Sequence, residues 1–229
     1  MNRFVRIIIG TVILPVAIAA GIIEYPYLSY KLLPVMPYYN QHVSWPNDGI
    51  DMVLPLSVGP RIGKAPNGDP ILSIPGQSNR DWVYREEFPH WWTGVGDVTS
   101  KKGIKPPSLQ DLTISEIRVI AYGDPRFQKL QVLDVTKNTK VIHGFLNPMR
   151  KRELVKVPDG GKVIGIELIS PELQGIALYT VVVILPGQGD YVYIASTSPN
   201  QPDSAIKMGP AFSNWLGQVQ QAHEGSFGM

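Results

Sequence analysis

Short stretches of alternating apolar and polar residues dominate the second half of the chain. Such alternation, with a period of two, is typical of a strand that buries one face. The stretches predict β-strands at 112–120, 130–135, 139–145, 153–157, 162–169, 176–185 and 191–195. No helical period is visible among them, so residues 109–200 are predicted to form a small antiparallel β-sandwich, Ig-like or jelly-roll-like.

Turn-forming residues separate these stretches and predict how they connect. Residues 158–161 (Pro-Asp-Gly-Gly) and 186–190 (Pro-Gly-Gln-Gly-Asp) each predict a hairpin between the strands on either side. Lys137 and Asn138 predict a tight turn in the same way. The run 180–185 is apolar at almost every position, as expected for a central strand.

The chain ends in a segment, residues 201–229, that holds a predicted helix over 210–224 and a tail. Pro210 suits the first turn of a helix. Residues at the spacing i, i+3, i+4 and i+7 form one apolar stripe: Phe212, Trp215, Leu216 and Val219. The stripe either packs back on the β domain or docks on a partner or the membrane. In the second interpretation, Phe212 and Trp215 belong to a partner interface.

The segment 24–108 has a different composition and predicts an extended, looping arm. It holds 12 of the 21 prolines, and proline both fixes φ and removes a backbone donor. Short strands are predicted only at 50–58 and 71–74. The segment has more aromatic residues than a disordered linker usually carries. We therefore expect it to become ordered on a surface, which could be its own domain, the membrane or a partner protein.

Two adjacent tryptophans in this arm, Trp91 and Trp92, are candidate partner-interface residues. In an extended chain their side chains point to opposite faces, so one could pack inward while the other meets a partner. Two other interpretations stay open: both are buried under the arm, or they form a stacking platform for a carbohydrate.

The first 23 residues predict a transmembrane anchor. Arg3 and Arg6 precede an uncharged run over 7–23, which with Phe4 and Val5 approaches the length that crosses a hydrocarbon core. A cleaved signal peptide is the alternative, because small residues at 17–20 match a cleavage site. Tyrosines that follow the span are predicted at the membrane interface: Tyr25, Tyr27, Tyr30, Tyr38 and Tyr39.

Flanking charges predict the orientation of this single-pass anchor. Arg3, Arg6 and the amino terminus lie before the span, whereas Glu24 offsets Lys31 after it. Positive charge is retained on the cytoplasmic side of a membrane. The N-terminus is therefore predicted to be cytoplasmic, with the main domain outside the cytoplasm, in a periplasm.

Composition and motifs exclude several classes of function. The net charge of +2 and the short basic runs argue against nucleic-acid binding. The absence of cysteine excludes disulfides and thiol chemistry. The four histidines, at 42, 90, 143 and 223, lie far apart in sequence, and no hydrolase elbow or phosphate loop is present. The sequence thus predicts no catalytic residues, no cofactor and no metal.

These features together favour a non-enzymatic accessory subunit of a multi-protein membrane complex. Its partners would be integral membrane subunits and membrane lipid, in a respiratory or photosynthetic assembly or an envelope secretion machine. The β-sandwich would brace neighbouring subunits outside the cytoplasm. The alternative is a membrane-tethered binding module for a carbohydrate or a peptide.

Overall fold

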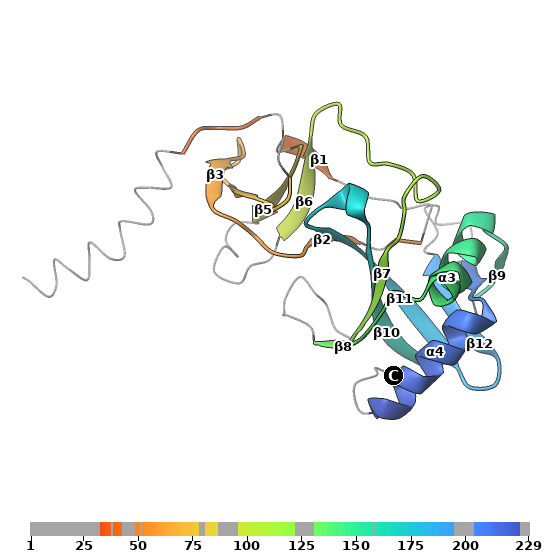
Figure 1. Cartoon of the computed structure of the whole chain (residues 1–229). Coiled ribbons are helices and arrows are strands. Elements are labelled where there is room, and N and C mark those ends of the chain that lie inside the picture. Colours follow the sequence, from red (N-terminus) through yellow and green to blue (C-terminus); the bar gives the residue numbers. More distant parts are fainter. Residues whose placement is uncertain are drawn as a thin grey trace, which may run out of the picture.

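A computed structural model of the chain describes residues 33–37, 39–42, 49–50, 52–77, 81–86, 96–121, 131–157, 159–194 and 204–224. Within these ranges the chain is mainly β, with two antiparallel sheets and two α-helices (Figure 1). The predicted mainly β class is confirmed. Two predictions concern residues outside the described ranges: the transmembrane anchor at 1–23 and the partner-interface tryptophans at 91–92.

The smaller sheet is built from the proline-rich segment. In spatial order its strands are β1 (Tyr39–His42), β6 (Gly96–Lys101), β5 (Trp82–Glu86), β4 (Pro70–Ser73) and β3 (Arg61–Lys64). The strand predicted at 71–74 is confirmed as β4. This segment is more regular than the looping arm expected from its prolines, because most described prolines lie between the strands or at their ends, where no ladder donor is needed.

The larger sheet carries most of the second half of the chain. Its spatial order is β8 (Val132–Thr136), β7 (Glu116–Ile120), β10 (Lys162–Ile169), β11 (Ile176–Leu185), β12 (Gly189–Ile194), β13 (Ser204–Lys207) and β9 (Leu154–Lys156). Strand β2 (Met52–Pro55) also pairs with β11, next to the half that β12 leaves free. All described strands between 109 and 200 therefore lie in this one sheet, whereas the β-sandwich predicted for residues 109–200 would have divided them between two sheets. The second sheet comes from the proline-rich segment instead.

Only one of the two hairpins predicted from Pro- and Gly-rich turns is present. Strands β11 and β12 pair through the predicted turn, and Leu185 faces Gly189. The turn at 158–161 predicts that β9 pairs with β10, and this prediction is wrong. Strand β9 lies at the far end of the sheet beside β13, with Leu154 opposite Ile206. Strand β10 pairs with β11 along its whole length and with β7 over Gly165–Ile169, so its only neighbours among the described strands are these two.

Residues 139–145, predicted as a strand, begin an α-helix instead: α3 (Thr139–Lys151). Asn138 is its N-cap, not part of a tight turn, because its Oδ1 accepts a hydrogen bond from the Lys140 N–H at 3.0 Å. The buried residues follow a helical spacing: Val141, Ile142, Phe145, Leu146 and Met149. Tertiary burial of this stripe decided between helix and strand.

The second helix, α4 (Pro210–Ala222), confirms the helix predicted over 210–224. It lies beside α3 (Figure 1). Pro148, inside α3, cannot donate a hydrogen bond to the Gly144 carbonyl one turn earlier. That carbonyl instead accepts a hydrogen bond from the N–H of Gly209, at 2.8 Å. Gly209 is the N-cap of α4. Hence the proline that leaves an acceptor free in one helix also fixes the start of the other.

The two sheets and the two helices share one hydrophobic core. Leu72 and Trp82 of the smaller sheet belong to the same buried cluster as Ile166 of the larger sheet and Phe145 and Phe212 of the helices. A smaller cluster lies on the other side of the smaller sheet. Of the three surfaces considered for the proline-rich segment, its own domain is the one on which these strands pack.

Candidate functional site

One edge of the larger sheet is formed by β9, whose three residues are all exposed. Among the described strands it pairs only with β13. Leu154 is 50% exposed and Val155 is 41% exposed. Because neighbouring residues in a strand point to opposite faces, both faces of this strand present an apolar side chain to solvent.

The chain reaches β9 through an unusual turn at the end of α3. Arg152 is the C-cap and has a φ of 54°, and its N–H donates to the Pro148 carbonyl. It is the one non-glycine residue with a positive φ in the described part of the chain. Glycine or asparagine usually takes this position. The left-handed turn lets β9 start only two residues later, at Leu154.

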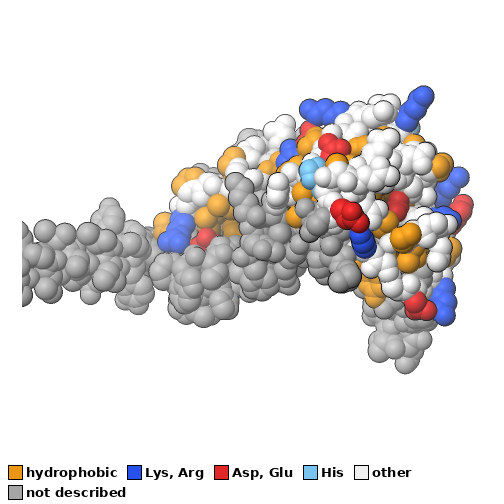
Figure 2. Space-filling view, turned by 90° about the horizontal axis from the view of Figure 1, so that it is seen from below, with side chains coloured by type: hydrophobic (Ala, Val, Ile, Leu, Met, Phe, Trp, Pro, Cys, Tyr) orange, Lys and Arg blue, Asp and Glu red, His pale blue; other side chains and the backbone are white. Residues whose placement is uncertain are grey.

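Positive charge collects around this strand. Residues 150–157 hold four basic residues and one acidic residue, a net +3, which exceeds the +2 of the whole chain. Arg150 is tied to the protein, because its Nη2 donates to the Leu112 carbonyl at 2.8 Å. Figure 2 shows lysine and arginine side chains, with acidic side chains among them, at the right-hand end of the molecule, the end at which α3 and β9 lie in Figure 1.

We call this surface the β9 edge and define it by the six exposed residues of the run 151–156: Lys151, Arg152, Glu153, Leu154, Val155 and Lys156. The ion pairs within the described residues involve none of its three cations. It combines an open strand, two apolar side chains and a net charge of +2 from three cations and Glu153. This arrangement can bind another molecule, but it offers no group that would carry out a reaction.

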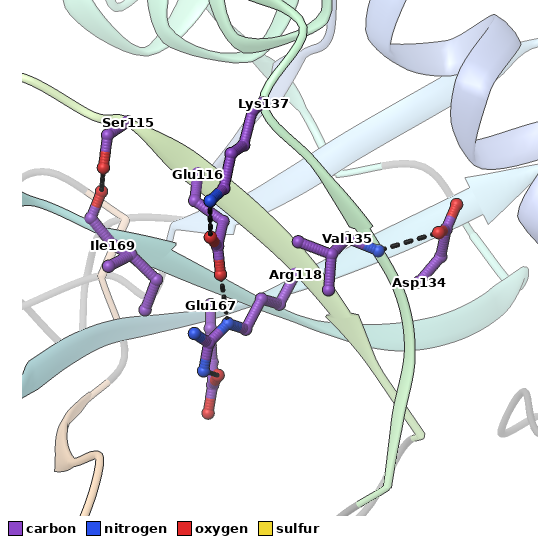
Figure 3. Close-up of polar contacts among 8 residues, drawn as sticks. All are labelled: Ser115, Glu116, Arg118, Asp134, Val135, Lys137, Glu167 and Ile169. Carbon is purple, nitrogen blue, oxygen red and sulfur yellow. Dashed lines mark hydrogen bonds and ion pairs between the residues drawn. The ribbon is translucent and has the colours of Figure 1, made fainter.

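The opposite edge of the sheet, at β8, is electrostatically different. Val132 and Val135 are 43% and 45% exposed, but the charged residues beside them form a closed network (Figure 3). Arg118 Nε lies 2.6 Å from Glu116 Oε1, and Lys137 Nζ lies 3.3 Å from the second oxygen of that carboxylate. Arg118 also reaches Glu167, at 3.8 Å. Charge is therefore paired at this edge.

The two carboxylates of this network differ in their pKa values. Burial raises the pKa of Glu116, but the hydrogen bonds and charges of Arg118 and Lys137 outweigh it, so its pKa lies below the ordinary 4.5. Burial also raises the pKa of Glu167, and here the more distant Arg118 does not compensate, so its pKa lies above 4.5. Ionised Glu116 thus stabilises the fold, whereas ionised Glu167 costs stability.

Replacing each glutamate by glutamine is expected to give opposite dependences on pH. Glu167→Gln removes a carboxylate that is costly to ionise, so its stability relative to the parent rises as pH increases from about 4.5 through the raised pKa. Glu116→Gln removes a stabilising carboxylate, so it is less stable at neutral pH, and its deficit shrinks as pH falls through the lowered pKa. Urea unfolding of the full-length chain in mild detergent, repeated across this pH range, measures both. If the unfolding free energies of the two variants, each taken relative to the parent, changed with pH in the same direction, the opposite pKa shifts of Glu116 and Glu167 would be contradicted.

The tyrosines predicted at the membrane interface lie mostly outside the described residues. This holds for Tyr25, Tyr27, Tyr30 and Tyr38. Tyr39 is described: it belongs to β1, is 2% exposed and packs in the smaller cluster with Met36, Ile71 and Val83. Its side chain is therefore held by the protein core in this structure.

Of the four candidate partner-interface residues, the structure describes only the two on α4. Trp91 and Trp92 lie outside the described residues. Phe212 is fully buried, with its ring centroid 5.0 Å from that of Phe145. Trp215 is half-buried, and its Nε1–H donates to Asp134 on β8 at 3.0 Å. The apolar stripe of α4 thus packs back on the β domain, which was one of its two interpretations, and leaves only part of Trp215 exposed.

In the described part of the chain, no three His, Asp or Glu residues are grouped as a metal site requires. No helix within the same residues is both long enough and apolar enough to span a membrane.

Comparison of the chain with protein-family models, with curated proteins and with solved structures finds no match. The β9 edge therefore has to be interpreted from its own geometry. Sequence reasoning missed it because β9 was assigned to a hairpin with β10. The run of three basic residues at 150–152, directly before an alternating stretch, was the available signal.

Proposed function

We propose that this chain is a membrane-anchored, non-enzymatic accessory subunit of a multi-protein membrane complex. In this proposal residues 1–23 form a single transmembrane helix, with the N-terminus in the cytoplasm. The β domain lies outside the cytoplasm and braces a neighbouring subunit. The observation that carries the proposal is the β9 edge, an open strand with exposed apolar side chains and a net positive charge.

The position of the β9 edge in the molecule supports a partner other than the tethering membrane. The chain enters the described part at residues 33–37, where Val35 bridges to Lys64 of β3. These residues lie at the end with the smaller sheet, and β9 lies at the opposite end (Figure 1). An anchor that precedes residue 33 would hold the first end near the bilayer. The β9 edge is then free to face a subunit that projects from the same membrane.

A stable association also needs a rigid surface, and the fold provides one. Binding costs less free energy when the contacting groups are already ordered. Strand β9 is held between the end of α3 and the ladder with β13, and Arg150 and Gln110 tie α3 to the preceding loop. The β9 edge is thus presented by regular structure.

Purification of the tagged full-length chain from its native membrane tests the proposal. In mild detergent we expect a fixed set of integral membrane proteins to accompany it at constant stoichiometry, identified by mass spectrometry. An unrelated single-pass protein with the same tag serves as the control. A lone monomer would contradict the subunit proposal. The alternative, a tethered module for a carbohydrate or a free peptide, would then be tested by ligand-dependent shifts of the melting temperature.

A further inference from the structure

We propose that the β9 edge binds an acidic, extended segment of the partner protein, which adds to the larger sheet as a further strand beside β9. This inference rests on the proposed function and specifies how the partner is bound. It names the chemistry of the partner segment: a strand with exposed backbone groups, apolar side chains at some positions and Asp or Glu at others.

The open backbone of β9 is the first argument for a strand. A strand at the end of a sheet presents unpaired N–H and C=O groups, which form a template for another strand. Strand β13 occupies one side of β9, and no described strand occupies the other. Main-chain hydrogen bonds provide affinity in this mode of recognition, and side-chain contacts provide specificity. A lipid surface offers no matching ladder of donors and acceptors.

The side chains of β9 argue for specific recognition and against simple protection of the edge. Proteins commonly protect an open edge with lysine or proline, or cover it with a loop. Lys156 fits that role, but Leu154 and Val155 expose apolar surface on both faces of the same strand. A strand laid beside β9 would cover both. The cations would repel a basic edge and attract an acidic one.

The backbone conformation of Arg152 supports a binding role for the positive charge at the β9 edge. A left-handed conformation is strained for a non-glycine residue, and Arg152 adopts it at φ 54°. Glycine would make the same turn without this strain. The chain therefore carries a guanidinium at the start of β9, at a position that glycine or asparagine usually takes, and an acidic partner would pair with it.

Site-specific cross-linking tests the inference in the full-length chain. A photoreactive benzoylphenylalanine is placed at Val155, and cells or native membranes are illuminated. We expect an adduct with one peptide of another membrane-complex subunit, rich in Asp and Glu, identified by mass spectrometry. The same probe at Val58, which is 48% exposed on another part of the chain, is the matched control and should not yield that peptide.

Charge removal gives the second readout. In the double variant Arg152→Gly and Lys156→Gln, the yield of the adduct at position 155 should fall about fivefold, as expected for the loss of two partly exposed ion pairs. The fold should survive, because glycine suits the conformation at 152. Lys102→Gln with Lys105→Gln removes the same charge from an exposed loop elsewhere and should leave the yield unchanged.

Several outcomes would overturn the inference. They are adducts to lipid alone, adducts to a peptide without acidic residues, no adduct at position 155, or equal yields in the two charge variants. Failure of this inference can be told from failure of the proposed function. If stoichiometric partners still purify with the chain while position 155 gives no acidic adduct, the subunit proposal stands and the strand-addition model falls. A lone monomer removes both.

Discussion

Replacing Phe212 with alanine is expected to lower the free energy of unfolding by about 3 to 5 kcal/mol, as for other fully buried phenylalanines. Phe212 has no exposed surface. Its ring contacts those of Phe145, at 5.0 Å, and Trp215, at 5.8 Å, both edge to face. The substitution removes these contacts and leaves a cavity between α4 and α3. Urea unfolding followed by near-UV circular dichroism measures the loss.

The cavity at Phe212 cannot collapse easily, because the helices already touch at their backbones. A Cβ added to Gly144 would lie 2.8 Å from the Phe212 nitrogen, and one added to Gly209 would lie 2.8 Å from the Gly144 carbonyl oxygen. Phe212→Leu is the matched control and should cost less than about 1.5 kcal/mol, because most of the volume is kept. A loss below about 1 kcal/mol for Phe212→Ala would show that α4 does not complete the core.

Replacing Gly175 with alanine is expected to destabilise the fold by about 2 to 5 kcal/mol, the sum of a backbone term and a steric term. Gly175 has a φ of 77°, and its added Cβ would lie 2.0 Å from the Pro75 carbonyl oxygen. This is a contact with backbone, so no side chain can move to relieve it. The Gly175 carbonyl also accepts the Leu56 N–H at 2.9 Å. The substitution would therefore disturb the junction between the two sheets.

Gly187→Ala separates the two contributions at Gly175. Gly187 has almost the same φ, 76°, but nothing lies within 4 Å of its added Cβ. It should lose only the backbone term of about 1 to 2 kcal/mol. Thermal unfolding measures the stability loss of both variants. The loss for Gly175→Ala minus the loss for Gly187→Ala gives the steric cost of the contact with Pro75. Equal losses for Gly175→Ala and Gly187→Ala would mean that the sheets are not in close contact at Pro75.

Helix α3 shows why one part of the fold was predicted wrongly. Residues 139–145 contain β-branched residues, which favour a strand, and the stretch follows two other predicted strands. The helical signal was present: apolar pairs at 141–142 and 145–146, and an N-cap at Asn138. Local sequence could not choose between the two, because a short apolar run satisfies both periods. Contact with α4 made the helix the better solution.

The candidate site could be predicted less well than the fold. Alternation in the sequence identified the stretch at 153–157 as a strand, and its basic flank was visible. Nothing local shows whether such a strand lies in the middle of a sheet or at its edge, because pairing joins residues far apart in sequence. Leu154 faces Ile206, which is more than fifty positions away. The exposure of Leu154 and Val155 follows from that pairing.

The sequence by itself determined which residues avoid water, because the alternation in β12, the apolar run of β11 and the apolar stripe of α4 are visible in the order of the residues alone. These features depend on the period of the backbone, which is local. Only the tertiary structure decided which strands are neighbours, that the proline-rich segment forms a sheet over the common core, and that β9 is left with an open edge. Those outcomes depend on contacts between distant segments, whose free energies are summed over the whole core and are not encoded at any one position.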